Sequence, residues 1–168
     1  QKAFIHKSYC KLSEYKEYEY PGSNYLPLQD RSYEIMEFLG DSILGSVVCS
    51  YLYKRFYGIH GQNEGFLTKL KIRLVCGENL CELSKKVCFQ KHLIISNHIE
   101  EKCSGRENSN ILEDVFEAFI GAIYLDLKDR LEILGRDSWV REDCERLTDV
   151  AILEIGSNRA IEKIQSGA

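Results

Sequence analysis

The chain has 168 residues, of which 44% are apolar and 29% are charged, and its formal net charge is −4. This length and composition fit one compact soluble domain, since single domains usually span about 100–200 residues. No run approaches the roughly 18 consecutive apolar residues of a membrane helix, and no signal-peptide pattern opens the chain. These absences exclude the membrane and secreted classes, so we expect an intracellular protein with no membrane partner, in either the nucleus or the cytoplasm. Because residue 1 is Gln, we also expect a missing upstream segment.

Seven cysteines are scattered along the chain, an odd number without any C-x-x-C pair. Neither a disulfide framework nor a zinc site is indicated by this arrangement. We expect reduced thiols that are mostly buried and pack as small apolar side chains.

Apolar residues recur at helical spacing nearly throughout, which predicts an all-α protein. The first element is a short helix over 2–13. Residues 14–28 contain both prolines of the chain, Pro21 and Pro27, and no sustained period, so they read as an extended connection. A long helix follows, capped by Asp30 or Ser32.

The long helix has apolar residues in helical register up to Gly58, where we expect it to stop. Four further helices are predicted, over 64–76, 78–89, 111–127 and 138–155. Asn63 is the expected cap of the first of these, and Asn110 with Glu113 forms a capping-box pattern before the third. One short helix is expected within 90–108, and one or two turns within 159–166.

Acidic residues lie on one stripe of each of two predicted helices. Glu34, Glu37 and Asp41 follow an i, i+3, i+7 spacing, and Asp114 and Glu117 follow an i, i+3 spacing in an otherwise apolar run. Like charges so placed repel by a few tenths of a kcal/mol per pair, and by more when they are partly buried. Hard divalent cations such as Mg²⁺ prefer oxygen ligands. A divalent-metal site shared by the two helices would therefore relieve this repulsion.

Three glycines interrupt the same helices, at Gly40, Gly45 and Gly121. Each occupies a position where alanine would be favoured by about 1 kcal/mol. Such glycines are costly unless crowding requires them, so we expect the helices or a ligand to come close there. On spacing alone, however, each acidic group could also be a solvated helix face, and the chemistry of a metal site stays open between phosphoryl transfer and diphosphate chemistry.

Four segments, in order along the chain, resemble motifs of the catalytic domain of ribonuclease III, the group that includes the nuclease domains of Dicer-type enzymes. Residues 33–44 (YEIMEFLGDSIL) are similar to the signature E-x-x-E-F-L-G-D, and residues 114–126 (DVFEAFIGAIYLD) to the second acidic motif. Residues 64–71 (EGFLTKLK) and 5–9 (IHKSY) resemble two further elements. The resemblance implies an all-α, ribonuclease III-type endonuclease domain that forms a homodimer.

The resemblance also implies roles for individual residues. Four carboxylates match the positions that both bind metal and catalyse, namely Glu37, Asp41, Asp114 and Glu117. Glu34 and Glu64 match supporting positions of an acidic valley. Phe38 matches an aromatic that contacts the partner subunit, although it also fits the apolar stripe of its own helix as a core residue.

The activity implied is hydrolysis of double-stranded RNA by a two-metal mechanism, with Mg²⁺ as the cofactor and Mn²⁺ able to substitute. The products would carry 5′-phosphate and 3′-hydroxyl ends, and the two subunits together would make a staggered cut. Such an enzyme would serve RNA processing or small-RNA production. Two other classes of protein are alternatives: a non-catalytic RNA-binding scaffold of the same fold, and an unrelated helical enzyme acting on diphosphates. The diphosphate enzyme would need a D-D-x-x-D motif, which the sequence lacks.

The chain departs from the family pattern toward its end and in its charge. We expect the catalytic domain to span 1–156, followed by a tail over 157–168 with no double-stranded-RNA-binding domain. The negative net charge predicts weak, salt-dependent RNA binding, because phosphate neutralisation usually dominates affinity. Lys69 and Arg73, four residues apart on one predicted helix, are candidate phosphate contacts, although a basic helix face is more often simply solvated.

Overall fold

The computed structural model describes residues 1–10, 12, 17, 19 and 22–133. Within this part of the chain, the regular elements are all helical, accompanied by two isolated β-bridges. The all-α prediction is confirmed. The helices expected over 138–155 and 159–166, and the expected boundary at residue 156, lie outside the described residues.

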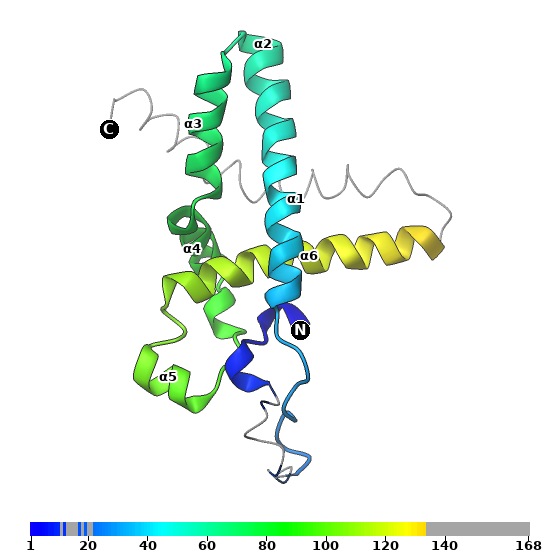
Figure 1. Cartoon of the computed structure of the whole chain (residues 1–168), viewed down its shortest axis with the longest axis vertical. Helices are drawn as coiled ribbons and strands as arrows, with labels where there is room; N and C mark the ends of the chain where they lie inside the picture. The colour runs from blue at the N-terminus through cyan, green and yellow to red at the C-terminus, as the bar shows by residue number, and fades with distance from the viewer. Residues whose placement is uncertain (11, 13–16, 18, 20–21, 134–168) are drawn as a thin grey trace.

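The long helix of the molecule is α1, Glu34–Leu52, which continues through a π-helical segment, Tyr53–Tyr57, into α2, Gly58–His60 (Figure 1). The predicted stop at Gly58 is wrong, because Gly58 itself is right-handed helical, with φ −63° and ψ −35°. The chain leaves the helix at Gly61, where φ is +61°. Glycine adopts this left-handed conformation without the steric cost that a Cβ would bring.

The start of α1 agrees with one of the two predicted caps. The Ser32 hydroxyl accepts a hydrogen bond from the backbone N–H of Glu34 at 3.4 Å and donates one to the Glu34 carboxylate at 2.8 Å. Tyr33 is the residue that directly precedes the helix. The serine thus satisfies one of the backbone donors that a helix leaves free at its start.

Three helices follow, α3 (Glu64–Val75), α4 (Gly77–Lys86) and α5 (Asn97–Cys103). The predicted cap of α3 is confirmed, because the Asn63 side chain accepts a hydrogen bond from the backbone N–H of Phe66 at 2.9 Å. Figure 1 shows α3 running back beside α1, so the two form a hairpin that rises beyond the rest of the molecule.

The last described helix is α6, Ser109–Ile133, which is longer than the predicted 111–127. Its start is also different from the prediction. The Asn108 side chain, rather than that of Asn110, accepts hydrogen bonds from the backbone N–H groups of Asn110 and Ile111, at 3.0 and 3.3 Å. Asn108 therefore lies where it can cap the helix, two residues earlier than the capping-box pattern indicated.

The N-terminal segment is not the helix predicted over 2–13. It forms two short 3₁₀ turns, Lys2–Phe4 and Lys7–Tyr9, separated by a parallel bridge between Ile5 and Ile94. The backbone N–H of His6 donates to the carbonyl of Ile94 at 3.0 Å. A partner far along the chain thus takes up backbone groups that a local helix would have used, which local apolar spacing does not reveal.

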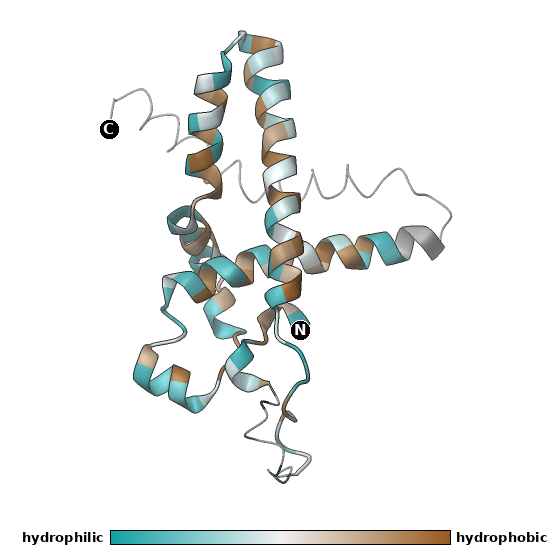
Figure 2. Cartoon of the chain, in the orientation of Figure 1, coloured by the Kyte–Doolittle hydropathy of each residue, from teal (hydrophilic) through white to brown (hydrophobic). Residues whose placement is uncertain are grey.

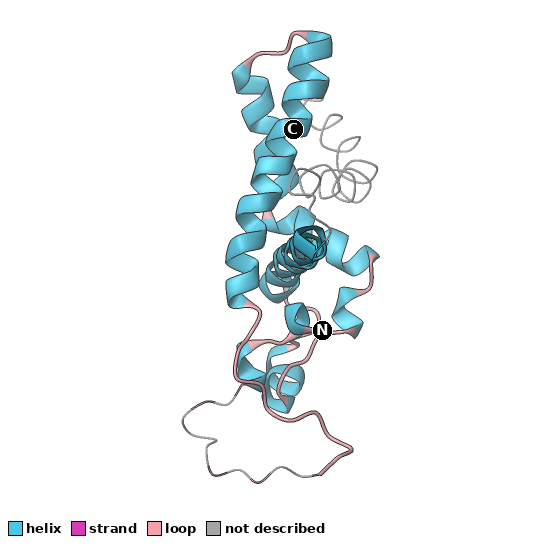
Figure 3. Cartoon of the chain, turned by 90° about the vertical axis from the view of Figure 1, so that its right-hand side faces the viewer, coloured by secondary structure: helices cyan, strands magenta, loops and turns pink. Residues whose placement is uncertain are grey.

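α1 and α6 cross at the centre of the fold, and α6 also packs along α4 (Figure 1). In the perpendicular view of Figure 3, α6 is seen nearly end-on beside α1. Leucines dominate the fully buried core, which extends from the crossing along α1, α3 and α4: Leu44, Leu52, Leu70, Leu74, Leu80, Leu83 and Leu112.

The crossing is close because two glycines face each other's helix. A Cβ added at Gly40 would overlap the backbone carbonyl of Glu117, and one added at Gly121 would overlap the carbonyl of Met36. The expectation of close approach is confirmed at these two positions. It is wrong for Gly45, since a Cβ there would have no neighbour within 4 Å.

One helix bears on the expectation that the chain has no membrane segment. The continuous helix Glu34–His60 is long and apolar enough to cross a membrane by length and composition, with a mean hydropathy of 1.4 in its most apolar window. The core helix of a soluble protein passes the same test, so the expectation of no membrane segment stays a prediction.

Among the described cysteines, all of which are free thiols, Cys10 and Cys81 are buried whereas Cys49 and Cys103 are exposed. The expectation of mostly buried thiols is therefore wrong for this part of the chain.

Candidate active site

The four predicted carboxylates lie around the α1–α6 crossing. Glu37 and Asp41 extend from α1, four residues apart and on either side of Gly40 in sequence, and Asp114 and Glu117 extend from α6, three residues apart. The backbone of Glu117 lies directly against Gly40. The absence of a side chain at the crossing therefore sets the two acidic helix faces against each other.

Glu117 lies at the electrostatic centre of this group. Burial raises its pKa first, and the negative charges of Asp41, Glu113, Glu37 and Asp114 raise it further, to about 8 from an ordinary 4.5. Each of the other three predicted carboxylates thus acts on Glu117 through space. The structure brings the four together into one acidic cluster, Glu37, Asp41, Asp114 and Glu117.

Two other members of the acidic cluster show the same crowding. Burial is the main cause that raises the pKa of Glu37, followed by the charges of Asp114 and Glu34. Burial also raises the pKa of Asp114, against the opposing effect of a hydrogen bond from Tyr33. Both shifts favour the neutral acid, and their main cause is burial, which disfavours the charged form.

Glu34 lies at the edge of the acidic cluster and has its own partners. Its carboxylate accepts the Ser32 hydroxyl, which is the main cause of its lowered pKa, and pairs with Lys7 at 3.4 Å. Both side chains of that ion pair are more than half exposed. The charge of Lys7 also lowers the pKa of Glu37 and Asp114, so this lysine partly offsets the acidic cluster from outside.

Two residues of the site were missed by sequence reasoning. Tyr33 is 2% exposed, and its hydroxyl donates a hydrogen bond to Oδ2 of Asp114 at 3.2 Å. Glu113 lies beside Asp114, and its carboxylate rests against Gly77 at the start of α4. Burial and the charge of Asp114 raise the pKa of Glu113. Its spacing of four residues from Glu117 was a signal in the sequence, whereas Tyr33 and Asp114 are joined only by folding.

The chemistry of the acidic cluster fits a hard divalent cation. Its donors are carboxylate oxygens, and the raised pKa values report negative charge that a cation would neutralise. Among the described residues, no group of three or more acidic, histidine or cysteine side chains is arranged so that it could by itself hold a metal ion. Mg²⁺ usually keeps several waters and takes one or two carboxylates, so an open arrangement of this kind matches its preference.

Glu64 does not join the acidic cluster within one subunit. It lies in the first turn of α3, at the far end of the hairpin, where its carboxylate accepts a hydrogen bond from Thr68 at 2.9 Å. At about 1.5 Å per residue, roughly 28 Å of helix separates Asp41 from His60, just before this turn. Of the two predicted phosphate contacts on α3, Lys69 is exposed and Arg73 is half-buried.

Phe38 is not part of the core. Its side chain is 76% exposed, and Ile35, one turn earlier on the same face, is 77% exposed. The interpretation of Phe38 as an ordinary core residue is therefore wrong. Figure 2 shows apolar residues along the length of α1 and α2, including the part that rises beyond α6.

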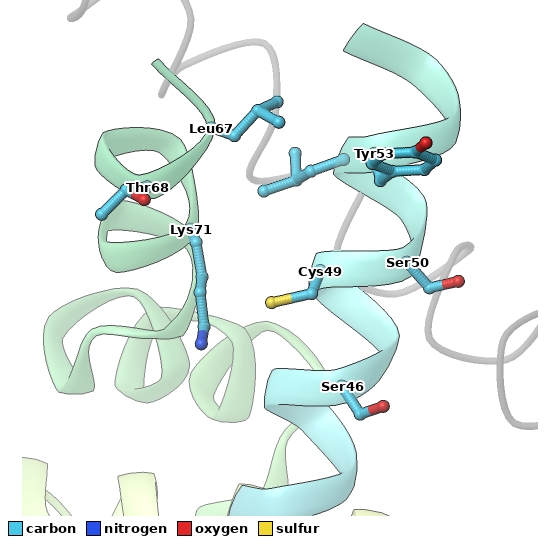
Figure 4. A pocket seen from close by; sticks show the side chains of 8 residues that line it. Ser46, Cys49, Ser50, Tyr53, Leu67, Thr68 and Lys71 are labelled. Atoms are coloured by element: carbon cyan, nitrogen blue, oxygen red, sulfur yellow. The ribbon is translucent and has the colours of Figure 1, made fainter. Parts of the chain in front are cut away.

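A groove of about 470 Å³ lies between α1 and α3, on the hairpin. Figure 4 shows Ser46 and Cys49 on α1 and Lys71 on α3, with the Cys49 sulfur directed toward α3. Among the residues that the structure describes, no carboxylate lines this groove. The groove and the acidic cluster are thus separate features of α1.

Comparisons with known proteins identify the family to which this chain is similar. The Ribonuclease III domain matches residues 34–128. Ribonuclease 3 of Rickettsia typhi is 39% identical over 119 residues, which cover 71% of this chain and 47% of that protein. Ribonuclease 3 of Lactobacillus acidophilus is 39% identical over 126 residues, covering 75% and 48%. The chain therefore spans about half the length of these curated relatives.

The fold matches solved structures as well. One structure of the nuclease domain of Ribonuclease III from Campylobacter jejuni, described for flexibility in a region involved in dimer formation, covers 92% of this chain and 84% of its own. Its TM-score is 0.66 at 26% sequence identity. The domain match spans more than half of the chain and includes all four residues of the acidic cluster. This chain belongs to the ribonuclease III domain family.

Proposed function

We propose that this chain is the catalytic domain of an endoribonuclease that hydrolyses double-stranded RNA. The observation that carries the proposal is the acidic cluster at the α1–α6 crossing, where burial first, and then the charges of neighbouring carboxylates on both helices, raise the pKa of Glu117 to about 8. Membership of the ribonuclease III family supports the substrate class. The relatives named Ribonuclease 3 support an endoribonuclease activity in RNA processing.

The residues of the acidic cluster would hold two Mg²⁺ ions, for which Mn²⁺ could substitute. Bound divalent ions would supply stabilisation of the negative charge that develops on the attacking and leaving oxygens of a phosphodiester. Water attacks phosphorus, the bond to the 3′ oxygen breaks, and the products carry 5′-phosphate and 3′-hydroxyl ends. Cation binding requires ionised ligands, so Glu117 would have to release its proton to hold a divalent ion.

A homodimer would place two acidic clusters along one RNA duplex, each cutting one strand to give a staggered product. Ile35 and Phe38 support this assembly, because two large apolar side chains so exposed on one helix face favour contact with another protein surface. The described dimer region of the Campylobacter jejuni nuclease domain gives the idea a precedent within the fold.

RNA binding by this chain would be weak and sensitive to salt. Two copies carry a formal charge of twice −4, or −8, which repels phosphates over the whole surface. Bound cations would offset the acidic cluster locally. Lys69, exposed on α3, and Arg73 on the same helix would contact phosphates.

The test is cleavage of labelled duplex and single-stranded RNA in Mg²⁺ and in EDTA, with Glu117→Gln beside the intact chain. We expect Mg²⁺-dependent cutting of the duplex, and a loss of at least about 100-fold in the variant, as for removal of a charge-stabilising group. Glu101→Gln, an exposed carboxylate on α5, is the matched control and should cut normally. Ca²⁺ should allow RNA binding with little cleavage, because its longer and looser coordination positions water poorly.

The proposal fails if the intact chain leaves duplex RNA uncut, or if Glu117→Gln cuts as fast as Glu101→Gln. Binding of duplex RNA without any cleavage in Mg²⁺ or Mn²⁺ would instead support a non-catalytic RNA-binding scaffold of the same fold.

A further inference from the structure

Tyr33 links the two helices that carry the acidic cluster. It directly precedes α1, its side chain is 2% exposed, and its hydroxyl donates to Oδ2 of Asp114 on α6. The two residues are 81 positions apart in the sequence. The hydrogen bond engages one oxygen of this carboxylate and leaves the other without a partner from Tyr33.

The position of the Tyr33 ring is set from several directions. Its backbone N–H donates to the carbonyl of Ile5 at 2.9 Å, and its own carbonyl accepts from the N–H of Glu37 at 3.0 Å. The ring of His6 packs against it with centroids 5.9 Å apart. Tyr33 is therefore held by the N-terminal segment and by the first turn of α1, and its hydroxyl is not free to follow Asp114 if that side chain rotates.

We propose that Tyr33 is a positioning residue for the divalent cation, which it affects by holding the Asp114 carboxylate in one orientation. This inference rests on the proposed function, since it assigns Asp114 a cation. Groups that hydrogen-bond to a metal ligand orient it, and their loss typically costs about 10–100-fold in metal affinity or activity. A burial role alone would be served equally by phenylalanine, which keeps the ring and its packing against His6 but cannot donate.

The experiment measures Mn²⁺ binding to the full chain by calorimetry, without RNA. We expect Tyr33→Phe to bind Mn²⁺ about 10-fold more weakly than the intact chain, at the low end of the range for such partners. Tyr9→Phe is the matched control, because the Tyr9 hydroxyl donates to the backbone carbonyl of Leu26 and not to a carboxylate. It loses the same atom and should bind Mn²⁺ normally.

A second readout guards against a general loss of stability. Each variant is melted with and without Mn²⁺, and the rise in Tm on adding the ion reports its affinity for the folded state. Tyr33→Phe should gain less than the intact chain, whatever its starting Tm. In cleavage assays, the Mg²⁺ concentration for half-maximal rate should rise about 10-fold while the KM for RNA is unchanged.

A double-mutant cycle identifies the route of the effect. In an Asp114→Ala background, which removes both the carboxylate and the acceptor of the Tyr33 hydroxyl, adding Tyr33→Phe should cause no further loss of Mn²⁺ affinity, because the hydroxyl acts through that carboxylate. Equal Mn²⁺ affinity of Tyr33→Phe and the intact chain, or full additivity in the cycle, would overturn the inference while the proposed nuclease stands. No Mn²⁺ binding by the intact chain would overturn both.

Discussion

The two halves of α1 pack in opposite ways. Its first half crosses α6 with Gly40 against the backbone of Glu117, and this contact places charged side chains side by side. Its second half, with α2 and α3, forms the hairpin, which carries exposed apolar residues and an open groove. Close backbone contact builds the candidate site on the first half, which also carries the exposed Ile35 and Phe38, whereas the second half forms a groove against α3.

The largest effect should come from adding a methyl group at the crossing. Gly40→Ala places a Cβ into the carbonyl of Glu117, so the helices must separate. We expect a loss of about 3 kcal/mol or more in the free energy of unfolding, at the upper end for overpacking, together with loss of cleavage. Urea unfolding followed by circular dichroism measures it.

Gly45→Ala is the matched control on the same helix, because its Cβ would meet open space. It should be neutral or stabilising by up to about 1 kcal/mol, from helix propensity alone. Equal destabilisation by the two alanines would show that the close crossing is not what distinguishes the first half of α1.

The next effect concerns the proposed dimer. Phe38→Ala should weaken self-association by about 30-fold or more, as expected for a central aromatic contact, in sedimentation velocity over a concentration series. Its thermal stability as a monomer should hardly change, because the side chain is 76% exposed. Tyr57→Ala is the control, because Tyr57 is an exposed aromatic on the hairpin, far along the helix from Phe38. A dimer that Phe38→Ala leaves intact but Tyr57→Ala disrupts would move the interface to the hairpin.

The charge crowding at the crossing should also appear in the pH dependence of stability. The pKa of Glu117 is about 8 in the folded chain and 4.5 ordinarily, so folding favours its protonated form. This contribution is fully present below about pH 4.5 and is lost as the pH rises through about 8. In EDTA, Glu117→Gln should therefore gain Tm over the intact chain on going from pH 5 to pH 8.5, by about 2–4 °C for each kcal/mol that ionisation of Glu117 costs the intact chain.

Scanning calorimetry at the two pH values, with Glu101→Gln as the exposed control, measures this difference. If the Tm of Glu117→Gln falls in parallel with that of the intact chain between pH 5 and pH 8.5, ionisation of Glu117 does not destabilise the folded chain. Added Mg²⁺ should reduce the advantage of the variant, because the cation neutralises the same charge in the intact chain.

The smallest effect is expected on the hairpin. Lys69→Gln should lower RNA affinity modestly and reduce the slope of log affinity against log salt by about one, as for loss of one phosphate contact. Lys102→Gln, an exposed lysine on α5, should leave the slope unchanged. Equal slopes for all three chains would assign Lys69 to the solvated helix face that its spacing also allows.

Sequence patterns predicted the helices well where each backbone or capping group finds its hydrogen-bond partner a few residues away along the chain. Asn63 caps α3 as expected, because a cap and its N–H partner lie within three residues. The segment 2–13 was mispredicted because Ile5 pairs with Ile94. The end of the continuous helix Glu34–His60 was placed three residues too early, because Gly58 is helical and the left-handed residue is Gly61. Tertiary context, and not the presence of a glycine, decides where the helix ends.

The candidate site divides in the same way. Spacing and resemblance named Glu37, Asp41, Asp114 and Glu117, and the fold brings these four together. Phe38 satisfied the apolar pattern of a core residue and yet lies on the surface. Helical periodicity identifies a face, but it does not say whether that face meets the chain's own core, solvent or another molecule.

The sequence by itself determined the helical class, the two acidic faces and the glycines beside them, because these depend on spacing within a single helix. Tertiary structure decided that Gly40 and Gly121 meet, that Glu64 stays at the far end of the hairpin, and that Tyr33 reaches Asp114. Contacts between distant segments depend on how helices cross, and no local pattern encodes a crossing. The sequence thus contains two separate charge patterns, and these form one acidic cluster only where the two helices are in contact.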